Sequence, residues 1–339
     1  MLAPGERDPA RRVPAVVMAG DRGAARPVRG QSKVFLELGG RALVSHVVWV
    51  LQQVPEVREV WVIGDARRLE SVLGPLREGL VKPLHVIEQL RTLYENAWEA
   101  YRRILPGAGP AGRDPESPED LDRAVFYLSG DLPFATPQEI SAFLRGALAQ
   151  DCDYALGVVD EASVEHFYPG APGGPGIHPV YFNVSEGRVR QSNLHLVKPG
   201  RVGNRHYIQE MYEHRYQKQL GNMLALGWTI LRSEQGGLRI VFYYLLMHLA
   251  SLADRWGWRR LADRVRTWIP TGRVEAAVGQ LLRASFRLMI THGGGCAIDI
   301  DKDEEYEAAR ARYEEWRGTQ RKRAEKLYGP PALPERSGP

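Results

Sequence analysis

Short apolar runs alternate with helical stretches along the first half of the chain, and this alternation constrains the fold most. The runs at 15–19, 59–63, 84–87 and 125–128 are typical of buried strands, and helical spacing of apolar residues fills the intervals. Such alternation predicts a mainly parallel sheet with helices on both faces. We therefore expect an α/β fold with a three-layer α/β/α, Rossmann-like core whose ligands bind at the carboxyl ends of the strands.

Beyond residue 150 the pattern changes. A hairpin is predicted around the turn at 185–187. The segment 206–290 has mainly helical spacing, and 293–303 is a strand-like run before a charged helix at 304–327. We therefore expect three parts, which are a core with the hairpin at 13–205, a helical insertion at 206–290, and a final core strand and helix at 291–328.

The composition is that of an ordinary globular protein, with 44% hydrophobic and 25% charged residues among 339. A net charge of +4 suits an anionic ligand, and we expect no nucleic-acid partner. Cys152 and Cys296 lack disulfide or zinc spacing, and the N-terminus lacks the apolar segment of a signal peptide. The apolar run at 240–253 is shorter than a membrane span of roughly 20 residues. We expect a cytoplasmic protein.

A loop with glycines and cations follows the first predicted strand. The loop and the residues after it include, in order, Ala19, Gly20, Asp21, Arg22, Gly23, Arg26 and Lys33. Small residues let backbone N–H groups approach phosphate oxygens closely. Arginine and lysine side chains supply positive charge to the same oxygens. The loop therefore indicates a polyphosphate site, and the alternative is a tight exposed connection with incidental charges.

A carboxylate follows the strand predicted at 125–128. Asp131 lies in the segment S-G-D-L-P-F, just beyond the end of that strand. Magnesium prefers oxygen ligands and usually takes one or two carboxylates together with phosphates and water. Asp131 is therefore the first candidate for a metal ligand, and the alternative is an aspartate that caps the following turn.

Three motifs in this order resemble the nucleotidyltransferase superfamily. The stretch M-A-G-D-R-G-A-A-R, followed by S-K-V-F-L-E-L-G-G, is similar to the phosphate loop of that superfamily and the lysine after it. S-G-D-L-P-F resembles its metal-binding segment, and A-I-D-I-D-K-D its closing motif. The resemblance covers 13–160 and 290–312. The group includes molybdenum-cofactor guanylyltransferases, sugar-phosphate nucleotidylyltransferases and small-alcohol-phosphate cytidylyltransferases.

The resemblance implies a Mg²⁺-dependent enzyme that joins a nucleoside monophosphate from a nucleoside triphosphate to a phosphorylated small molecule. Lys33, Arg22 and Arg26 would hold the triphosphate during transfer, and pyrophosphate would leave. The implied nucleotide contacts are Ala19, Gly20, Asp21, Gly23, Gln89 and Asn96. The implied metal ligands are Asp131 with Asp299, Asp301 or both. Asp299 and Asp301 alternate along a predicted strand, so only one would easily face the site.

The motifs depart from the superfamily pattern at three positions. Asp21 stands where a glycine is expected, Arg26 comes one residue late, and Ser32 replaces the proline before Lys33. A carboxylate in a phosphate loop repels the ligand unless it points away or meets a metal. Two alternatives follow, which are a glycosyltransferase of related fold that uses a nucleotide sugar and a non-catalytic, membrane-associated relative.

Cations gather after the predicted hairpin, where relatives bind their acceptor. Arg190, Lys198 and Arg205 are the expected contacts to an acceptor phosphate, and the alternative is a solvated charged face. His195 lies in the apolar run L-H-L-V, which favours a partly buried histidine over a catalytic base.

The segment 238–290 combines aromatic side chains with many arginines, including Trp256, Trp258 and Trp268. A helical bundle that buries its own aromatic side chains is the favoured expectation. Peripheral membrane contact through 238–290 and a homo-oligomer interface are the alternatives.

Overall fold

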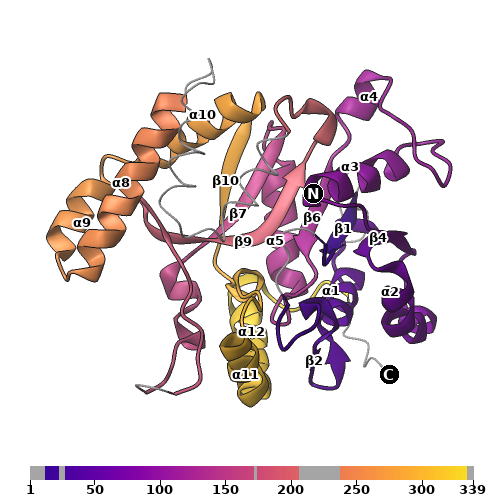
Figure 1. The fold of residues 1–339 in the computed structure, drawn as a ribbon, viewed down its shortest axis with the longest axis horizontal. Helices are drawn as coiled ribbons and strands as arrows, with labels where there is room; N and C mark the ends of the chain where they lie inside the picture. Colours follow the sequence, from indigo (N-terminus) through magenta and orange to yellow (C-terminus); the bar gives the residue numbers. More distant parts are fainter. Residues whose placement is uncertain (1–11, 23–26, 172–173, 206–236, 334–339) are drawn as a thin grey trace.

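The computed structural model describes residues 12–22, 27–171, 174–205 and 237–333, which include an eight-stranded sheet (Figure 1). The strand order is β10-β7-β9-β6-β1-β4-β5, and β8 pairs with β9 beside this path. The strands are β1 (Val13–Ala19), β4 (Val57–Gly64), β5 (Leu84–Glu88), β6 (Val125–Ser129), β7 (Tyr154–Asp160), β8 (Phe182–Val184), β9 (Gly187–Val197) and β10 (Phe286–Thr291). Two short strands, β2 (Glu37–Leu38) and β3 (Arg41–Ala42), form a separate ribbon.

The sheet is mainly parallel, as the alternation predicts. β1 pairs in parallel with β4 and β6, β4 with β5, and β7 with β10. β9 runs antiparallel between β6 and β7, so its beginning lies beside the carboxyl end of β7. The register places Arg190 opposite Val159 and Val197 opposite Val125. The beginning of β9 therefore lies at the carboxyl ends of the parallel strands, which form the carboxyl edge of the sheet. The end of β9 lies at their amino ends, which form the amino edge.

Helices cover both faces of the sheet and complete three layers. The helices of the core are α1 (Leu43–Gln52), α2 (Ala66–Leu73), α3 (Leu93–Ile104), α4 (Pro118–Leu121) and α5 (Pro137–Leu148). Alternate residues of β1 point to opposite faces. Ala15 and Val17 pack in a cluster with side chains of α1, α2 and α5, whereas Val16 packs in a cluster with α3 and α10 (Thr271–Leu282).

Two C-terminal helices, α11 (Asp303–Ala311) and α12 (Tyr313–Tyr328), hold the end of the chain against the core. The fully buried ring of Trp316 meets Phe134 edge-on at a centroid distance of 5.5 Å and Phe167 at 5.1 Å. Phe134 follows Asp131 in the same loop and packs in one cluster with Ile298 and Ile300, so the loop after β6 is joined to the segment that contains Asp299 and Asp301.

The predicted strand at 293–303 is wrong, because β10 occupies Phe286–Thr291, within the segment expected to be helical. A Cβ on Gly295 would lie 1.9 Å from the carbonyl oxygen of Phe134, and Gly294 has φ +90°. The glycines therefore form a tight connection against the core, and a 3₁₀ turn follows at Gly295–Ala297. The expected boundary at 290/291 falls inside β10. The charged helix expected at 304–327 is two helices that meet at Arg312.

The described part of the helical insertion contains α8 (Gly237–Arg255), α9 (Arg259–Arg266) and α10. Figure 1 shows α8 and α9 side by side at one edge of the molecule, beyond β10 and far from α2. Trp256, Trp258 and Trp268 are 58%, 55% and 57% exposed, so the expectation that the bundle buries its own aromatic side chains is wrong for all three. The helical pattern predicted over 206–236 lies outside the described residues. Among the described helices, none is long and apolar enough to cross a bilayer.

Candidate active site

Three aspartates meet at the carboxyl ends of β1 and β6. Asp131 is fully buried, and the amide N–H of Gly130 donates to Met18 O of β1 at 3.0 Å, which fixes the turn before it. Asp299 and Asp301 come from the segment between the glycine turn and α11. One carboxylate oxygen from each aspartate lies within 4.8 Å of the others. The expectation that only one of the pair would face the site is wrong. Residues two apart on extended backbone point to the same side, so Asp299 and Asp301 both face the site while Ile298 and Ile300 are buried in the core.

Two cations compensate part of this negative charge. Lys33 Nζ lies 2.5 Å from Asp131 Oδ2 and 2.5 Å from Asp301 Oδ1. Arg190 donates from one guanidinium nitrogen to Asp299 Oδ1 at 2.7 Å and from Nε to Ala297 O at 2.7 Å. Three carboxyl groups thus share two cationic side chains.

Burial and neighbouring charge act on the same carboxylates. Burial, and after it the neighbouring Asp301, raise the pKa of Asp299 to about 6, while Arg190 opposes the shift. Burial and the charge of Asp301 both disfavour the ionised form of Asp299. The site is therefore one in which additional positive charge is stabilising.

The donor set fits a magnesium ion. All three side chains offer carboxylate oxygens, which Mg²⁺ prefers. Asp131 Oδ2 is buried and accepts no hydrogen bond among the described residues, although it is ion-paired with Lys33. A buried acceptor that lacks a hydrogen bond is costly unless a cation or water satisfies it.

Lys33 reaches the cluster from a short 3₁₀ turn, Lys33–Phe35, after the phosphate loop. Val34 is buried in the core and anchors this turn. Ser32 has φ −62°, a value that proline also adopts. The backbone before Lys33 is therefore one that the superfamily proline would also fit.

Asp21 turns its carboxylate away from Lys33 and toward β5. Its backbone N–H donates to Gln89 Oε1 at 2.8 Å, and Gln89 Nε2 donates back to Asp21 Oδ1 at 2.7 Å. Arg68 Nη1 lies 3.5 Å from Asp21 Oδ2. The carboxylate in the phosphate loop thus has two polar partners, and its negative charge is partly compensated.

The remaining described loop residues lie beside the predicted base-reading residues. A Cβ on Gly20 would be 3.0 Å from Asn96 Nδ2 and 3.2 Å from Gln89 Oε1, so the loop packs closely against both amides. Arg22 donates to Gln89 O at 2.9 Å and to Glu88 Oε1 at 2.9 Å. The structure therefore brings Ala19, Gly20, Asp21 and Arg22 together with Gln89 and Asn96. Gly23 and Arg26 lie outside the described residues.

The three predicted acceptor residues are dispersed. Arg190 lies in the cluster at the carboxyl edge of the sheet. Lys198 lies at the opposite edge, where its amide N–H donates to Asp153 O at 2.7 Å. Arg205 stacks over the ring of Trp98 on α3, 4.0 Å from the ring centroid. The structure thus brings only Arg190 of these three to the aspartates.

A protein-family model matches the part of the chain that contains most of this site. The family model of the MobA-like NTP transferase domain matches residues 15–215, which is more than half of the chain. The chain belongs to this MobA-like family. The matched region contains the phosphate loop, Asp131 and Arg190, whereas Asp299 and Asp301 lie beyond it.

Curated relatives of this MobA-like chain carry a more specific name. It is 29% identical over 117 residues to 2-C-methyl-D-erythritol 4-phosphate cytidylyltransferase from Chlorobium luteolum, and 30% identical over 114 residues to the same enzyme from Chlorobium phaeovibrioides. These matches cover 34% and 33% of this chain, and 46% and 44% of the relatives. The chain thus matches less than half the length of the two relatives.

A solved structure supports the fold of this MobA-like chain. A hypothetical transferase from Thermus thermophilus superposes with a TM-score of 0.57 and 18% sequence identity. The superposition covers 87% of this chain and 99% of the Thermus protein. The three-layer architecture with a mainly parallel sheet is therefore shared, and the predicted fold class is confirmed.

Sequence reasoning missed Glu139, which organises the loop before the aspartates. The Glu139 carboxylate is fully buried and accepts from the amides of Gly294 at 3.0 Å and Cys296 at 3.2 Å, and from Thr291 Oγ1 at 3.1 Å. Burial raises the pKa of this carboxyl. In the sequence Glu139 resembled any acidic residue in the first turn of a helix. The three glycines at 293–295 were the available signal, because they permit the close approach.

Ser129 is a second residue that sequence reasoning missed. Its hydroxyl donates to Asp131 Oδ1, the oxygen that does not face Lys33. The two oxygens of Asp131 therefore have different partners. This arrangement fixes the orientation of the carboxylate at the end of β6.

His195 has the partly buried position that the sequence favours. Its Nδ1 lies 2.8 Å from the Tyr154 hydroxyl, and its Nε2 lies 3.1 Å from Gln191 Nε2. Both ring nitrogens thus have partners within the sheet.

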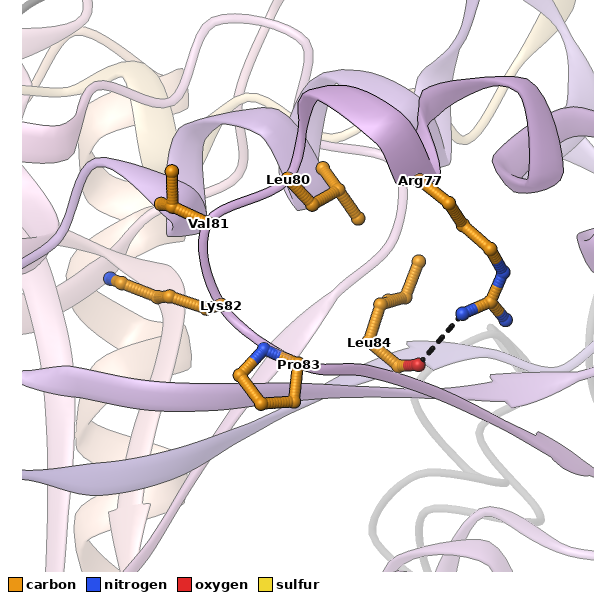
Figure 2. A pocket seen from close by; sticks show the side chains of 6 residues that line it. All are labelled: Arg77, Leu80, Val81, Lys82, Pro83 and Leu84. Carbon is orange, nitrogen blue, oxygen red and sulfur yellow. Dashed lines mark hydrogen bonds between the residues drawn. The ribbon is translucent and has the colours of Figure 1, made fainter.

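Two cavities lie at the amino edge of the sheet, away from this cluster. One, of about 310 Å³, lies around the start of β5. Figure 2 shows the residues that line it, among them Arg77, which donates to Leu84 O. The other, of about 360 Å³, is lined by Cys152, Asp153 and Lys198 among others. Neither cavity is lined by Lys33 or the three aspartates, so neither belongs to the candidate active site.

Proposed function

We propose that this chain is a Mg²⁺-dependent nucleotidyltransferase that joins a nucleoside monophosphate to a phosphorylated small molecule. One observation carries the proposal, which is the convergence of Asp131, Asp299 and Asp301 around Lys33 beside the phosphate loop. Membership of the MobA-like family supports nucleotide chemistry at this place.

The proposed reaction is a single in-line displacement. An oxygen of the acceptor phosphate attacks the α-phosphorus, the bond from that phosphorus to the bridging oxygen breaks, and pyrophosphate leaves. The acceptor phosphate is already an anion, so the reaction requires no general base. Positioning and electrostatic stabilisation supply most of the rate enhancement in this class of reaction.

We assign Lys33 to the triphosphate and the three aspartates to the metal. A bound Mg²⁺ would neutralise charge that develops on the phosphate oxygens. Lys33 lies between Asp131 and Asp301. Its ammonium group would therefore contact a triphosphate that is bound beside these carboxylates. Arg22 lies half exposed beside β5 and supplies a further cation at the loop.

We assign Gln89 and Asn96 to the nucleobase. Both amides are buried and packed against Gly20, and an amide presents a donor and an acceptor side by side. Asp21 then has a positioning role, because its reciprocal hydrogen bonds set which way the Gln89 amide points.

We assign Arg190 to the acceptor side. It lies in β9, the second strand of the hairpin, holds Asp299, and is the one predicted acceptor cation beside the aspartates. A guanidinium can bind phosphate through two parallel hydrogen bonds. The names of the curated relatives make CTP and 2-C-methyl-D-erythritol 4-phosphate the first substrate pair to test.

The decisive experiment measures binding before turnover. Thermal unfolding of the full chain is followed with each of the four nucleoside triphosphates, with and without Mg²⁺. We expect one triphosphate to raise Tm only with Mg²⁺, since a ligand that binds the folded state stabilises it. Pyrophosphate release is then assayed with that triphosphate and a panel of sugar and polyol phosphates.

Each alternative gives a different result. Stabilisation by nucleotide sugars, with no response to free triphosphates, would indicate a glycosyltransferase. No response to either ligand class would indicate a non-catalytic relative. The variant Lys33→Met should lose the triphosphate response, whereas Lys322→Met, which removes an exposed lysine of α12, should keep it.

A further inference from the structure

Helix α8 carries two apolar stripes, and only one of them is buried. The inner stripe contains Leu246 and Ala250 and packs in one cluster with Val184 and Val189 of the sheet. The outer stripe consists of Phe242, Leu245, Leu249 and Leu252 and continues to Trp256 just past the end of α8, and each of these residues is at least 40% exposed. Spacings of three and four residues place the outer stripe on one continuous helix face. A surface helix normally directs one apolar face inward, so the second face needs an explanation.

Polar contacts fix the orientation of α8 and α9. The buried Asn183 of β8 donates from Nδ2 to Ser251 Oγ at 2.8 Å, and it accepts from Arg266 Nε at 2.8 Å. Arg266 is also ion-paired with Asp254. A rotation of α8 that buried the outer stripe would break these contacts and expose the inner stripe. The exposed apolar face is therefore a fixed feature of the fold.

Tryptophan and arginine side chains continue this face onto α9. Trp256 and Trp258 pack edge to face across the connection between the helices, with ring centroids 5.1 Å apart. Trp268 and Leu261 are also exposed. Arginines at three exposed positions accompany them, at 259, 260 and 264, against the exposed Asp263. Apolar and aromatic side chains edged by arginine are typical of segments that lie in the interface of a bilayer.

The charge argues against a second copy of the chain as the partner. A twofold interface places the same patch against itself, so two surfaces that each carry three exposed arginines and one exposed aspartate would meet with like net charge. An anionic surface complements the arginines, and their aliphatic stems can lie along apolar surface.

We propose that the outer stripe of α8, with Trp258, Leu261, Trp268 and the arginines of α9, docks on a lipid bilayer that carries anionic headgroups. The apolar side chains enter the headgroup region, and the arginines meet the lipid phosphates. The proposal is independent of the proposed catalytic function, because no residue of this surface belongs to the candidate active site.

Vesicle flotation of the full chain tests the proposal. We expect the protein to float with vesicles of phosphatidylcholine mixed with phosphatidylglycerol, and to float much less with phosphatidylcholine alone. Added salt should weaken the association, because screening acts on the arginine contribution. Tryptophan fluorescence should shift to the blue with the mixed vesicles as the exposed indoles leave water.

Matched variants separate the two contributions. Leu245→Glu should weaken vesicle binding by about tenfold or more, since it places a charge in the apolar face. Val81→Glu changes a residue of similar exposure, 55% against 60%, beside β5, and should not alter binding. Replacing Arg259, Arg260 and Arg264 by serine should weaken binding on the order of a hundredfold. The same change in net charge at Arg91, Arg145 and Arg310 should have a much smaller effect.

Two results would overturn the proposal. One is failure to float with the anionic vesicles. If light scattering then shows a monomer, residues of the same chain cover the stripe. If it shows a dimer that Leu245→Glu dissociates, a second copy of the chain covers the stripe. The other is equal loss of binding in Leu245→Glu and Val81→Glu, which would mean that the outer stripe is not the contact surface.

Discussion

In most proteins polar side chains are exposed and large apolar ones are buried. The candidate active site departs from the first rule, and the outer stripe of α8 departs from the second. In the site, Asp131, Glu139 and Gln89 are buried although their side chains are polar. On α8 and α9, large apolar side chains such as Leu245 and Trp256 are exposed. Buried polar groups and exposed apolar patches are the two departures that carry information about function. The comparison teaches that this chain has two surfaces whose composition the folding of a monomer does not explain.

The two regions also differ in how each is stabilised. In the site, polar side chains are satisfied by partners that are distant in sequence, such as Lys33 with Asp301 and Glu139 with Gly294. On α8, the outer side chains follow one another along a single helix. Single substitutions in the site should therefore change activity or stability. Single substitutions on the outer stripe should change neither until a partner is bound.

The largest effect is expected at Asp131. Asp131→Asn keeps the size of the side chain but removes a charge that Lys33 and the proposed metal both need, so kcat/KM should fall about 10²- to 10³-fold. Pyrophosphate release measures the change, and Asp114→Asn, an exposed aspartate, is the matched control. Near-normal turnover in Asp131→Asn would refute the metal assignment.

The next effect is expected at Glu139, as a loss of stability. Gly294 and Cys296 donate to different oxygens of Glu139, so Glu139→Gln places an NH₂ group against one of these two amide donors, whichever way the new amide is oriented. Leaving buried donors unsatisfied should lower the free energy of unfolding by about 2–3 kcal/mol. Urea denaturation measures this change, with Glu78→Gln as the exposed control. An unchanged midpoint would show that the loop does not depend on this carboxylate.

The two stripes of α8 offer a matched pair of substitutions on one helix. Leu246→Ala empties a buried position and should lower the free energy of unfolding by about 2–4 kcal/mol. Leu249→Ala, on the outer stripe, should change it by no more than about 0.5 kcal/mol. Equal losses in urea denaturation without lipid would show that the outer stripe is covered in the free protein.

A pH-dependent effect is expected at Lys82, outside both regions. Burial lowers the pKa of this lysine from 10.5 to about 7, while Glu56 opposes the shift. Between these values the unfolded chain binds a proton that the folded chain does not, so stability rises with pH. The difference in unfolding free energy, wild type minus Lys82→Met, should increase from pH 7 toward pH 10 by at most about 1.4 kcal/mol per unit. Lys322→Met, an exposed control, should give a flat difference.

The smallest effect is expected at Asp21, where the direction of the change in nucleotide affinity shows what the carboxylate does. Asp21→Gly introduces the superfamily glycine but removes the acceptor that orients Gln89, so nucleotide affinity should fall about fivefold. Asp21→Asn keeps an oxygen acceptor and should restore most of the affinity. Isothermal titration with the preferred triphosphate measures both variants. Tighter binding by Asp21→Gly would show that the carboxylate repels phosphate.

Much of the core could be predicted because its signals are local. The strand at 125–128 and the helix at 93–104 follow from apolar periodicity, and they agree with β6 and α3 to within one residue. β10 was missed because its exposed Arg287 and the helical spacing before it resemble the end of a helix. The separation of Lys198 from Arg190 could not be predicted, because it depends on the direction and register of β9 in the sheet.

The sequence by itself determined the alternating architecture, the order of the three motifs and the residue types available for phosphate and metal. These depend on local periodicity and on side-chain chemistry. Only the tertiary structure decided that Asp21 turns to Gln89, that both Asp299 and Asp301 reach Asp131, and that Glu139 holds the glycine turn. It also decided which stripe of α8 is buried. Contacts between distant segments depend on how elements pack, and no periodicity within one segment records that packing.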